Sequence, residues 1–181
     1  MPRPLPRRVS VRLRRASQYG CPVTERHRLV RVPASSANLG PGYDVMAVAL
    51  DIFLELEVRE FGEFSVDCDL AGVPLDRDTL VVRAFETLHS ADGINFKVGG
   101  DIPLARGMGS SAAAIVAGIV AADHLFELGL SREEMLEHAN RLEGHPDNVA
   151  AALSGGFVIC AELDGRVIST RVDSPEGLEG I

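Results

Sequence analysis

PLARGMGSSAAAIVAGIV, residues 103–120, is the stretch around which the chain is organised. A glycine and serine turn opens there directly into a long run of small apolar residues. Gly107 and Gly109 allow a tight turn and a close approach of the backbone to a ligand, because neither carries a Cβ that clashes at positive φ. Ser110 or Ser111 is expected to cap the helix that follows. The free amides of the first helical turn, together with the helix dipole, predict a phosphate site.

A glycine turn before an apolar helix can also do no more than reverse the chain, and this stretch alone leaves that alternative open. Two other phosphate-binding motifs are excluded. A Walker-type loop needs a lysine after its last glycine, but the only lysine in the chain is Lys97, which is followed by Val98. A dinucleotide-binding fingerprint needs a third glycine where this chain has Ala112. The predicted phosphate loop therefore contains no lysine.

Length and composition predict one soluble, globular domain. A chain of 181 residues with 46% hydrophobic and 24% charged residues is long enough to bury a substantial core. No apolar run approaches the roughly 18 residues that a membrane helix needs, so we expect no membrane role. Cys21, Cys68 and Cys160 are widely spaced and odd in number, which fits reduced thiols in a cytoplasmic protein better than a disulfide framework or a zinc site.

The charges are unevenly distributed along the chain. The net charge is −8, but residues 1–31 contain nine arginines and a single acidic residue, Glu25. The remainder is therefore strongly acidic and repels nucleic acid, so we expect no nucleic-acid partner.

The first 28 residues are basic and show no hydrophobic periodicity. A transit peptide or a basic arm has this composition, and so has a disordered leader. Three prolines oppose the amphipathic helix of a presequence and favour the leader: Pro2, Pro4 and Pro6. We therefore predict a leader over residues 1–28 and an ordered domain over residues 29–181.

Alternating apolar and polar side chains predict several strands. The segment DIFLELEVRE, which starts at Asp51, has the period of two that is typical of a strand buried on one face. Asp164 and Gly165 form a favourable turn between two further strands at the end of the chain. The predicted strands cover residues 29–35, 51–60, 64–70, 94–104, 155–163 and 166–172.

Helical spacing of apolar residues predicts three helices, at residues 79–89, 110–128 and 130–144. Asp78 is the expected cap of the first, and Gly129 ends the second. Ser131 and Glu134 form a capping box at the start of the third.

Two clusters of polar side chains lie outside the glycine loop. The first surrounds the turn at Pro41 and Gly42, and turn chemistry alone remains an alternative explanation for it. Its members are Ser35, Ser36, Asn38, Tyr43 and Asp44. The second surrounds Pro146 and contains too many polar groups for an ordinary turn, which a metal or phosphate partner would explain. Its members are Glu143, His145, Asp147 and Asn148.

Three segments taken together resemble a known kinase superfamily. They are PASSANLGPGYD at 33–44, PLARGMGSSAAA at 103–114 and EGHPDNVAAAL at 143–153. Their order and spacing are similar to those of the galactokinase, homoserine kinase, mevalonate kinase and phosphomevalonate kinase (GHMP) superfamily, and most of all to homoserine kinase. The first and third segments carry the specific part of the likeness, because the superfamily shares the glycine and serine loop. The likeness covers residues 29 to about 181, the amino-terminal half of such enzymes.

The resemblance implies an α+β fold, the ribosomal protein S5 domain 2-like amino-terminal domain of a GHMP kinase, with the carboxy-terminal domain absent. It implies transfer of the γ-phosphoryl group of ATP to the side-chain hydroxyl of L-homoserine, which gives O-phospho-L-homoserine for threonine biosynthesis. The face that would meet the second domain is expected to be apolar enough to promote association, so a homodimer is also expected.

The resemblance also assigns site residues. The ATP phosphates would bind along Pro103, Leu104, Ala105, Arg106, Gly107, Met108, Gly109, Ser110, Ser111, Ala112 and Ala113. Mg²⁺ would be held by Glu143 with an oxygen from Ser110 or Ser111, and Glu137 is the alternative carboxylate. Asn38 and Asp44 match positions that contact homoserine, and Asp44 would pair with its ammonium group. His145 and Asn148 line the same pocket, and Asn148, His145 and Asp147 are the implied catalytic residues.

The chain departs from the family pattern at several places. Thr79 stands where family members commonly have an asparagine, which puts an adenine contact there in doubt. Tyr43 replaces the usual phenylalanine, and Arg106 and Met108 vary the glycine loop. Three functions therefore stay open: a homoserine kinase in truncated form, a related small-molecule kinase, or a nucleotide-binding module without catalysis.

Overall fold

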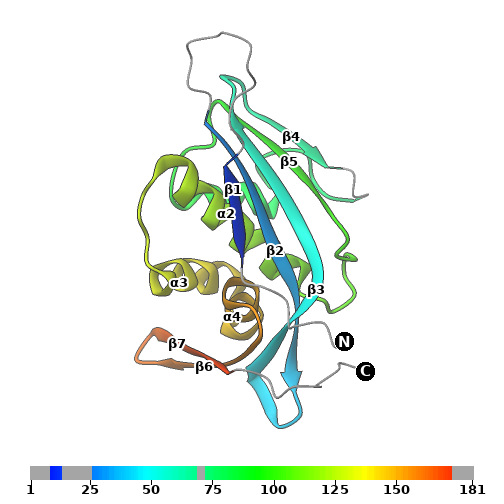
Figure 1. Cartoon of the computed structure of the whole chain (residues 1–181), viewed down its shortest axis with the longest axis vertical. Helices are drawn as coiled ribbons and strands as arrows, with labels where there is room; N and C mark the ends of the chain where they lie inside the picture. Colours follow the sequence, from blue (N-terminus) through cyan, green and yellow to red (C-terminus); the bar gives the residue numbers. More distant parts are fainter. Residues whose placement is uncertain (1–8, 14–25, 69–71, 173–181) are drawn as a thin grey trace.

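Two long antiparallel strands, β2 (His27–Leu39) and β3 (Gly42–Glu60), run along most of the structure (Figure 1). The computed structural model describes residues 9–13, 26–68 and 72–172. Along the second half of β3, Leu54, Leu56 and Val58 are buried while Glu55 and Arg59 are exposed. This confirms the predicted half-buried strand, because alternate side chains of a strand point to opposite faces.

The predicted strand at residue 51 is only the second half of β3. The partner of Pro33 in β2 is Phe53, whereas the partner of the next residue, Ala34, is Leu50. This register shift is a β-bulge in β3, and bulges bend a strand and change its twist locally. The sequence pattern is interrupted at this point, which is why the first half of the strand was not predicted as part of it.

One mixed sheet of seven strands organises the described chain. Its order is β1-β2-β3-β5-β4, and β6 pairs with β3 and then with β7. All pairs are antiparallel except β4 with β5. The remaining strands are β1 (Ser10–Leu13), β4 (Ser65–Cys68), β5 (Ile94–Gly100), β6 (Phe157–Leu163) and β7 (Arg166–Val172). The last two form the predicted hairpin through Asp164 and Gly165.

In the described part of the chain, four helices pack against the sheet: α1 (Leu80–Glu86), α2 (Ser110–Phe126), α3 (Arg132–Glu143) and α4 (Pro146–Ser154). Helix α2 is central, and most of its side chains are buried. A Cβ at Gly118 would lie 2.2 Å from the carbonyl oxygen of Val81, so this glycine lets α1 and α2 pack closely. Helix α4 was not predicted, because its first turn is polar and its apolar stretch is short.

The helix ends confirm some predictions and correct others. The capping box of Ser131 and Glu134 is present at α3. Asp78 is not the cap of α1, because Thr79 occupies that position, and Thr79 Oγ1 donates 2.8 Å to the carbonyl oxygen of Asp76 instead of capping the helix. Ser110 and Ser111 do not cap α2 either, since Gly109 is its N-cap and both serines lie inside its first turn.

The expected leader is described only at residues 9–13 and 26–28, and there the structure differs from the prediction. Residues Ser10–Leu13 form β1, which pairs with Arg28–Arg31 of β2 at the edge of the sheet. Alternation of valine with polar residues over this stretch is the strand signal that the surrounding arginines and prolines hid. The other residues of the predicted leader lie outside the described part of the chain.

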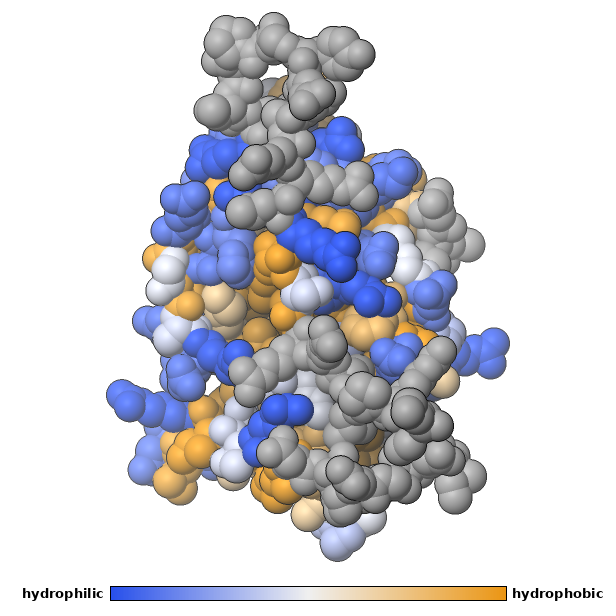
Figure 2. All heavy atoms as spheres, in the orientation of Figure 1, coloured by the Kyte–Doolittle hydropathy of each residue, from blue (hydrophilic) through white to orange (hydrophobic). Residues whose placement is uncertain are grey.

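The surface carries apolar side chains around the β6–β7 hairpin (Figure 2). Leu163 and Ile168 are 60% and 53% exposed. Association of two copies through such a face stays a prediction. No helix among residues 9–13, 26–68 and 72–172 combines the length and apolar character that a membrane-spanning helix needs.

Candidate active site

The glycine loop before α2 has the backbone conformation that its sequence predicts. Gly107 and Gly109 have φ values of 71° and 62°, in the left-handed region that favours glycine. Ala105 also lies there, with φ 54°. Because Gly109 is the N-cap, the amides of Ser110 and Ser111 belong to the first turn of α2 and have no acceptor within the helix. The loop therefore presents free N–H groups at a helix N-terminus, which is a site for an anion.

Gly109 has a second reason to be a glycine, which the sequence did not reveal. A Cβ at this position would lie 2.1 Å from the Oγ atom of Ser35, a fully buried residue of β2. The backbone N–H of Ser35 donates 3.2 Å to the carbonyl oxygen of Met108. The loop is therefore packed directly on β2, and Gly109 is required by the protein's own packing as well as by any ligand.

The predicted metal ligands Ser111 and Glu143 lie in direct contact. Ser111 Oγ donates 2.6 Å to Glu143 Oε2, joining the first turn of α2 to the last residue of α3. Glu137, the alternative ligand, instead pairs with Arg141 at 3.6 Å on the surface of α3. Among the described residues no group of three or more histidine, cysteine or acidic side chains is arranged to hold a metal ion.

The second polar cluster forms the start of α4. His145 is the N-cap and is exposed, whereas Asp147 is only 1% exposed. Asp147 Oδ1 accepts a hydrogen bond of 2.6 Å from the backbone N–H of Asn148. The Oδ1 atom of Asn148 accepts one of 2.9 Å from Ser35 Oγ. The third motif is thereby held against the first.

Asn38 and Asp44 lie at the two ends of the turn between β2 and β3. Their φ values are 58° and 54°, a backbone conformation that residues other than glycine rarely adopt and that Asn and Asp adopt more often than most. The backbone N–H of Asp44 donates 2.8 Å to Asn38 Oδ1. The side-chain carbonyl group of Asn38 therefore stabilises the turn, as the alternative explanation from turn chemistry predicted. The side-chain nitrogen of Asn38 and the Asp44 carboxylate remain available to a ligand.

Cys160 in β6 lies near two acidic residues of the site, Asp44 and Asp147. Burial, together with the nearby charges of Asp147 and Asp44, raises the pKa of the Cys160 thiol to about 11. The thiol is 1% exposed and donates 3.3 Å to the carbonyl oxygen of Val45. Because both carboxylates act on one thiol, Asp44 and Asp147 both lie near Cys160, although 103 positions separate them in the chain.

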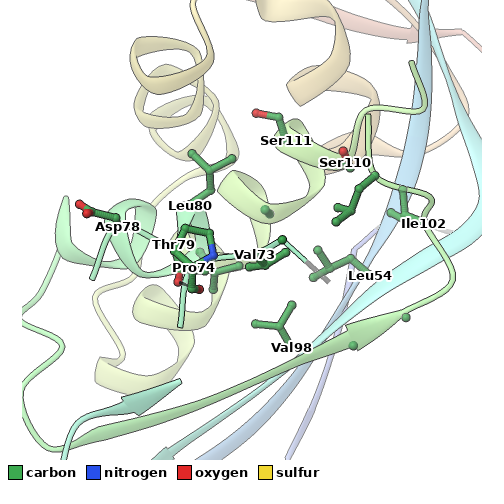
Figure 3. A pocket seen from close by; sticks show the side chains of 16 residues that line it. Leu54, Val73, Pro74, Asp78, Thr79, Leu80, Val98, Ile102, Ser110 and Ser111 are labelled. Carbon is green, nitrogen blue, oxygen red and sulfur yellow. Dashed lines mark hydrogen bonds between the residues drawn. The ribbon is translucent and has the colours of Figure 1, made fainter. Parts of the chain in front are cut away.

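A mostly apolar hollow of about 350 Å³ lies beside the first turn of α2 (Figure 3). Leu54 and Val98 of the sheet line one part of it, and Pro74 and Leu80 line another, with Ser110 and Ser111 at the start of α2. The Thr79 side chain is tied to the segment before α1 by its hydrogen bonds to backbone carbonyl groups. Sequence reasoning missed this hollow, because its walls come from five separate segments, each of which has only an ordinary core pattern.

The structure thus brings the three motifs together. The glycine loop, the Ser111–Glu143 pair, the start of α4 and the β2–β3 turn adjoin one another through Ser35, Asn148 and Cys160. Of the residues assigned to the phosphate loop, 103–109 form the loop and 110–113 begin α2. The roles of these residues toward a ligand remain predictions.

Residues 79–156 match the family described as the GHMP kinases N terminal domain. The homoserine kinase of Lactobacillus acidophilus is 44% identical over 149 residues, which cover 81% of this chain and 52% of that protein. The chain therefore spans about half the length of the curated relatives it matches.

Solved structures show the same relationship. The homoserine kinase of Cytophaga hutchinsonii is 28% identical, with a TM-score of 0.68, and the match covers 88% of this chain and 55% of that one. The mevalonate kinase of Methanococcus jannaschii shares the fold, with a TM-score of 0.63 at 14% identity, over 82% of this chain and 56% of that one. These findings confirm the resemblance inferred from the sequence, and the α+β fold of a GHMP kinase amino-terminal domain.

Proposed function

We propose that this chain, which carries the amino-terminal domain of the GHMP kinases, acts as the nucleotide-binding half of a homoserine kinase. The reaction is transfer of the γ-phosphoryl group of ATP to the side-chain hydroxyl of L-homoserine, which gives ADP and O-phospho-L-homoserine for threonine biosynthesis. The observation that carries the proposal is the junction of the glycine loop with the Ser111–Glu143 pair at the start of α2. The similarity to homoserine kinases supports the choice of acceptor.

ATP is proposed to bind across the loop and the apolar hollow. The amides of residues 107–111 would hold the phosphates, since they lie at a helix N-terminus. The hollow adjoins the same turn through Ser110 and Ser111 and has the apolar walls that a purine base requires. Thr79, the N-cap of α1, lines this hollow. Its hydroxyl already donates hydrogen bonds to backbone carbonyl groups.

The residues at the start of α2 fit a magnesium ion. Mg²⁺ prefers oxygen ligands at 2.0–2.1 Å in octahedral geometry, so two adjacent ligands lie about 3 Å apart. The Ser111 and Glu143 oxygens are separated by 2.6 Å and need only a small adjustment. Mg²⁺ usually keeps several waters and binds the phosphates as well, so two protein ligands are sufficient. When bound, the ion would neutralise charge on the transferring phosphoryl group.

L-Homoserine is proposed to lie between the β2–β3 turn and the start of α4. Asp44 would pair with its ammonium group, and the amide nitrogens of Asn38 and Asn148 would donate to its oxygens. Asp147 holds the first turn of α4 by accepting the N–H of Asn148. The hydroxyl oxygen forms the new bond to phosphorus as the bond to ADP breaks, and exposed His145 is the group we assign to receive the hydroxyl proton.

Positioning rather than covalent chemistry carries this mechanism. The transition state of phosphoryl transfer spreads its charge over the oxygens of the phosphoryl group, so aligned amides and cations lower the barrier. Alignment of two bound substrates can contribute roughly 7–11 kcal/mol. The described residues would contribute to that alignment from the start of α2, the start of α4 and the β2–β3 turn.

Calorimetric titration distinguishes this function from its alternatives. Mg²⁺ and a non-hydrolysable ATP analogue are added first, and L-homoserine, mevalonate or L-serine is then titrated into separate samples. The proposal predicts heat of binding for L-homoserine and none for mevalonate. Binding of mevalonate alone would indicate a related GHMP kinase, and binding of the nucleotide alone would indicate a nucleotide-binding module.

A further inference from the structure

One buried serine, Ser35, contacts all three of the converging motifs. It lies in the first motif, on the part of β2 that runs beneath the glycine loop, and is fully buried. Its Oγ occupies the space that a Cβ of Gly109 would need. The same Oγ donates 2.9 Å to Asn148 Oδ1 at the start of α4, and the Ser35 backbone N–H donates to Met108. A residue with these contacts sets the distance between the loop and α4.

Ser35 and Asp147 hold the Asn148 amide from two sides. With Oδ1 toward Ser35, the Nδ2 atom lies 3.5 Å from Asp147 Oδ1. If the amide were flipped, an oxygen would take that place beside the Asp147 carboxylate, which accepts hydrogen bonds and donates none when ionised. Asp147 therefore selects the orientation of the amide, and the Ser35 hydroxyl, which can donate or accept, anchors the amide in place. An amide NH₂ has two N–H groups, so one remains free for a ligand.

We propose that Ser35 is a positioning residue for phosphoryl transfer: it holds the Asn148 amide at a fixed position relative to the phosphate loop. This inference rests on the proposed function, because its consequence for catalysis requires Asn148 to contact the acceptor. Ser35 belongs to the first polar cluster, but the resemblance assigned it no role. Loss of a supporting hydrogen bond of this kind typically lowers activity 10- to 100-fold.

The first test does not depend on activity. The side-chain NH₂ resonances of Asn148 are assigned in a ¹H–¹⁵N NMR spectrum from their absence in Asn148→Ala. Ser35→Ala is expected to shift these resonances and leave those of Asn95 and Asn140 in place. Ser154→Ala removes another buried serine hydroxyl, at the far end of α4, and is the matched control. Unchanged Asn148 resonances in a folded Ser35→Ala protein would overturn the proposal.

The second test is a double-mutant cycle on homoserine-dependent ADP release. Ser35→Ala is expected to lower kcat 10- to 100-fold with little change in KM for ATP, because the backbone bond to Met108 is kept. In the Asn148→Ala background the same change should have no further effect, since Ser35 acts through Asn148. An equal loss in both backgrounds would refute the positioning role. If the wild-type chain released no ADP with homoserine, the proposed function would fail, and the NMR result would still decide how Asn148 is held.

Discussion

Replacing Gly107 by alanine separates a phosphate-binding loop from a simple turn. Gly107 has φ 71°, and a Cβ built on it would meet no atom within 4 Å. The substitution therefore causes no clash in the free protein, and its cost is that of holding alanine in the left-handed region, about 1–2 kcal/mol. Gly129 offers a matched control, because it has φ 75°, equally open surroundings and a position beyond the other end of α2.

The two substitutions should destabilise the fold alike but affect ATP differently. Each is expected to lower the free energy of unfolding by about 1–2 kcal/mol. The added methyl group at position 107 would also stand where the phosphate approaches the loop backbone, so it costs ATP binding a steric term that is separate from the cost to folding. The dissociation constant for Mg·ATP should rise about tenfold, which corresponds to about 1.4 kcal/mol, in Gly107→Ala and stay unchanged in Gly129→Ala.

Urea denaturation and calorimetric titration of Mg·ATP at 25 °C measure the two quantities. Both variants must be folded under the titration conditions for the comparison to hold. If Gly107→Ala loses stability as Gly129→Ala does, yet binds ATP as tightly as the wild type, the loop does not contact phosphate. The reasoning from its backbone conformation would then be refuted.

Three further predictions follow from the same contacts. Glu143→Gln should lower ATP affinity in the presence of Mg²⁺ more than in its absence, as titrations with and without the ion would show, whereas equal losses would remove the ligand role. Gly109→Val should destabilise the fold itself, because its Cβ would lie 2.1 Å from Ser35 Oγ, and an unchanged urea midpoint would contradict the packing. Burial raises the pKa of the Cys160 thiol to about 11, so folding favours the neutral thiol. The stability that comes from this preference is fully present below the ordinary thiol pKa and is lost as the pH rises toward 11. The free energy of unfolding should fall over that range, less steeply in Cys160→Ala, and an identical slope in the two proteins would show that the thiol is not responsible.

Local patterns predicted much of the fold, because they act over a few residues. The capping box of α3, the Asp164–Gly165 turn and the left-handed glycines before α2 depend on neighbours in the chain and were predicted correctly. Where a local rule had two solutions, the prediction failed: Asp78 and Thr79 are both good caps, and the N-cap is Thr79, whose hydroxyl donates to the backbone carbonyl groups of Pro74 and Asp76.

Contacts between distant segments could not be predicted from pattern. The close packing of Ser35 against Gly109 joins two positions that are far apart in the chain. The apolar hollow has walls from the sheet, two helices and two loops. The resemblance to a kinase family placed the three motifs in one site, but it did not indicate that Ser35 holds two of them together. That contact depends on the register of β2 beneath the loop.

The central claim is that the start of α2 holds Mg·ATP while the start of α4 and the β2–β3 turn hold L-homoserine. A ¹H–¹⁵N NMR titration of the chain, first with Mg·ATP and then with L-homoserine, tests it most directly. The nucleotide is expected to shift the amide signals of residues 103–113 most, and homoserine is then expected to shift those of Asn38, Asp44 and residues 145–148. A folded protein in which saturating Mg·ATP leaves residues 103–113 unperturbed would contradict it.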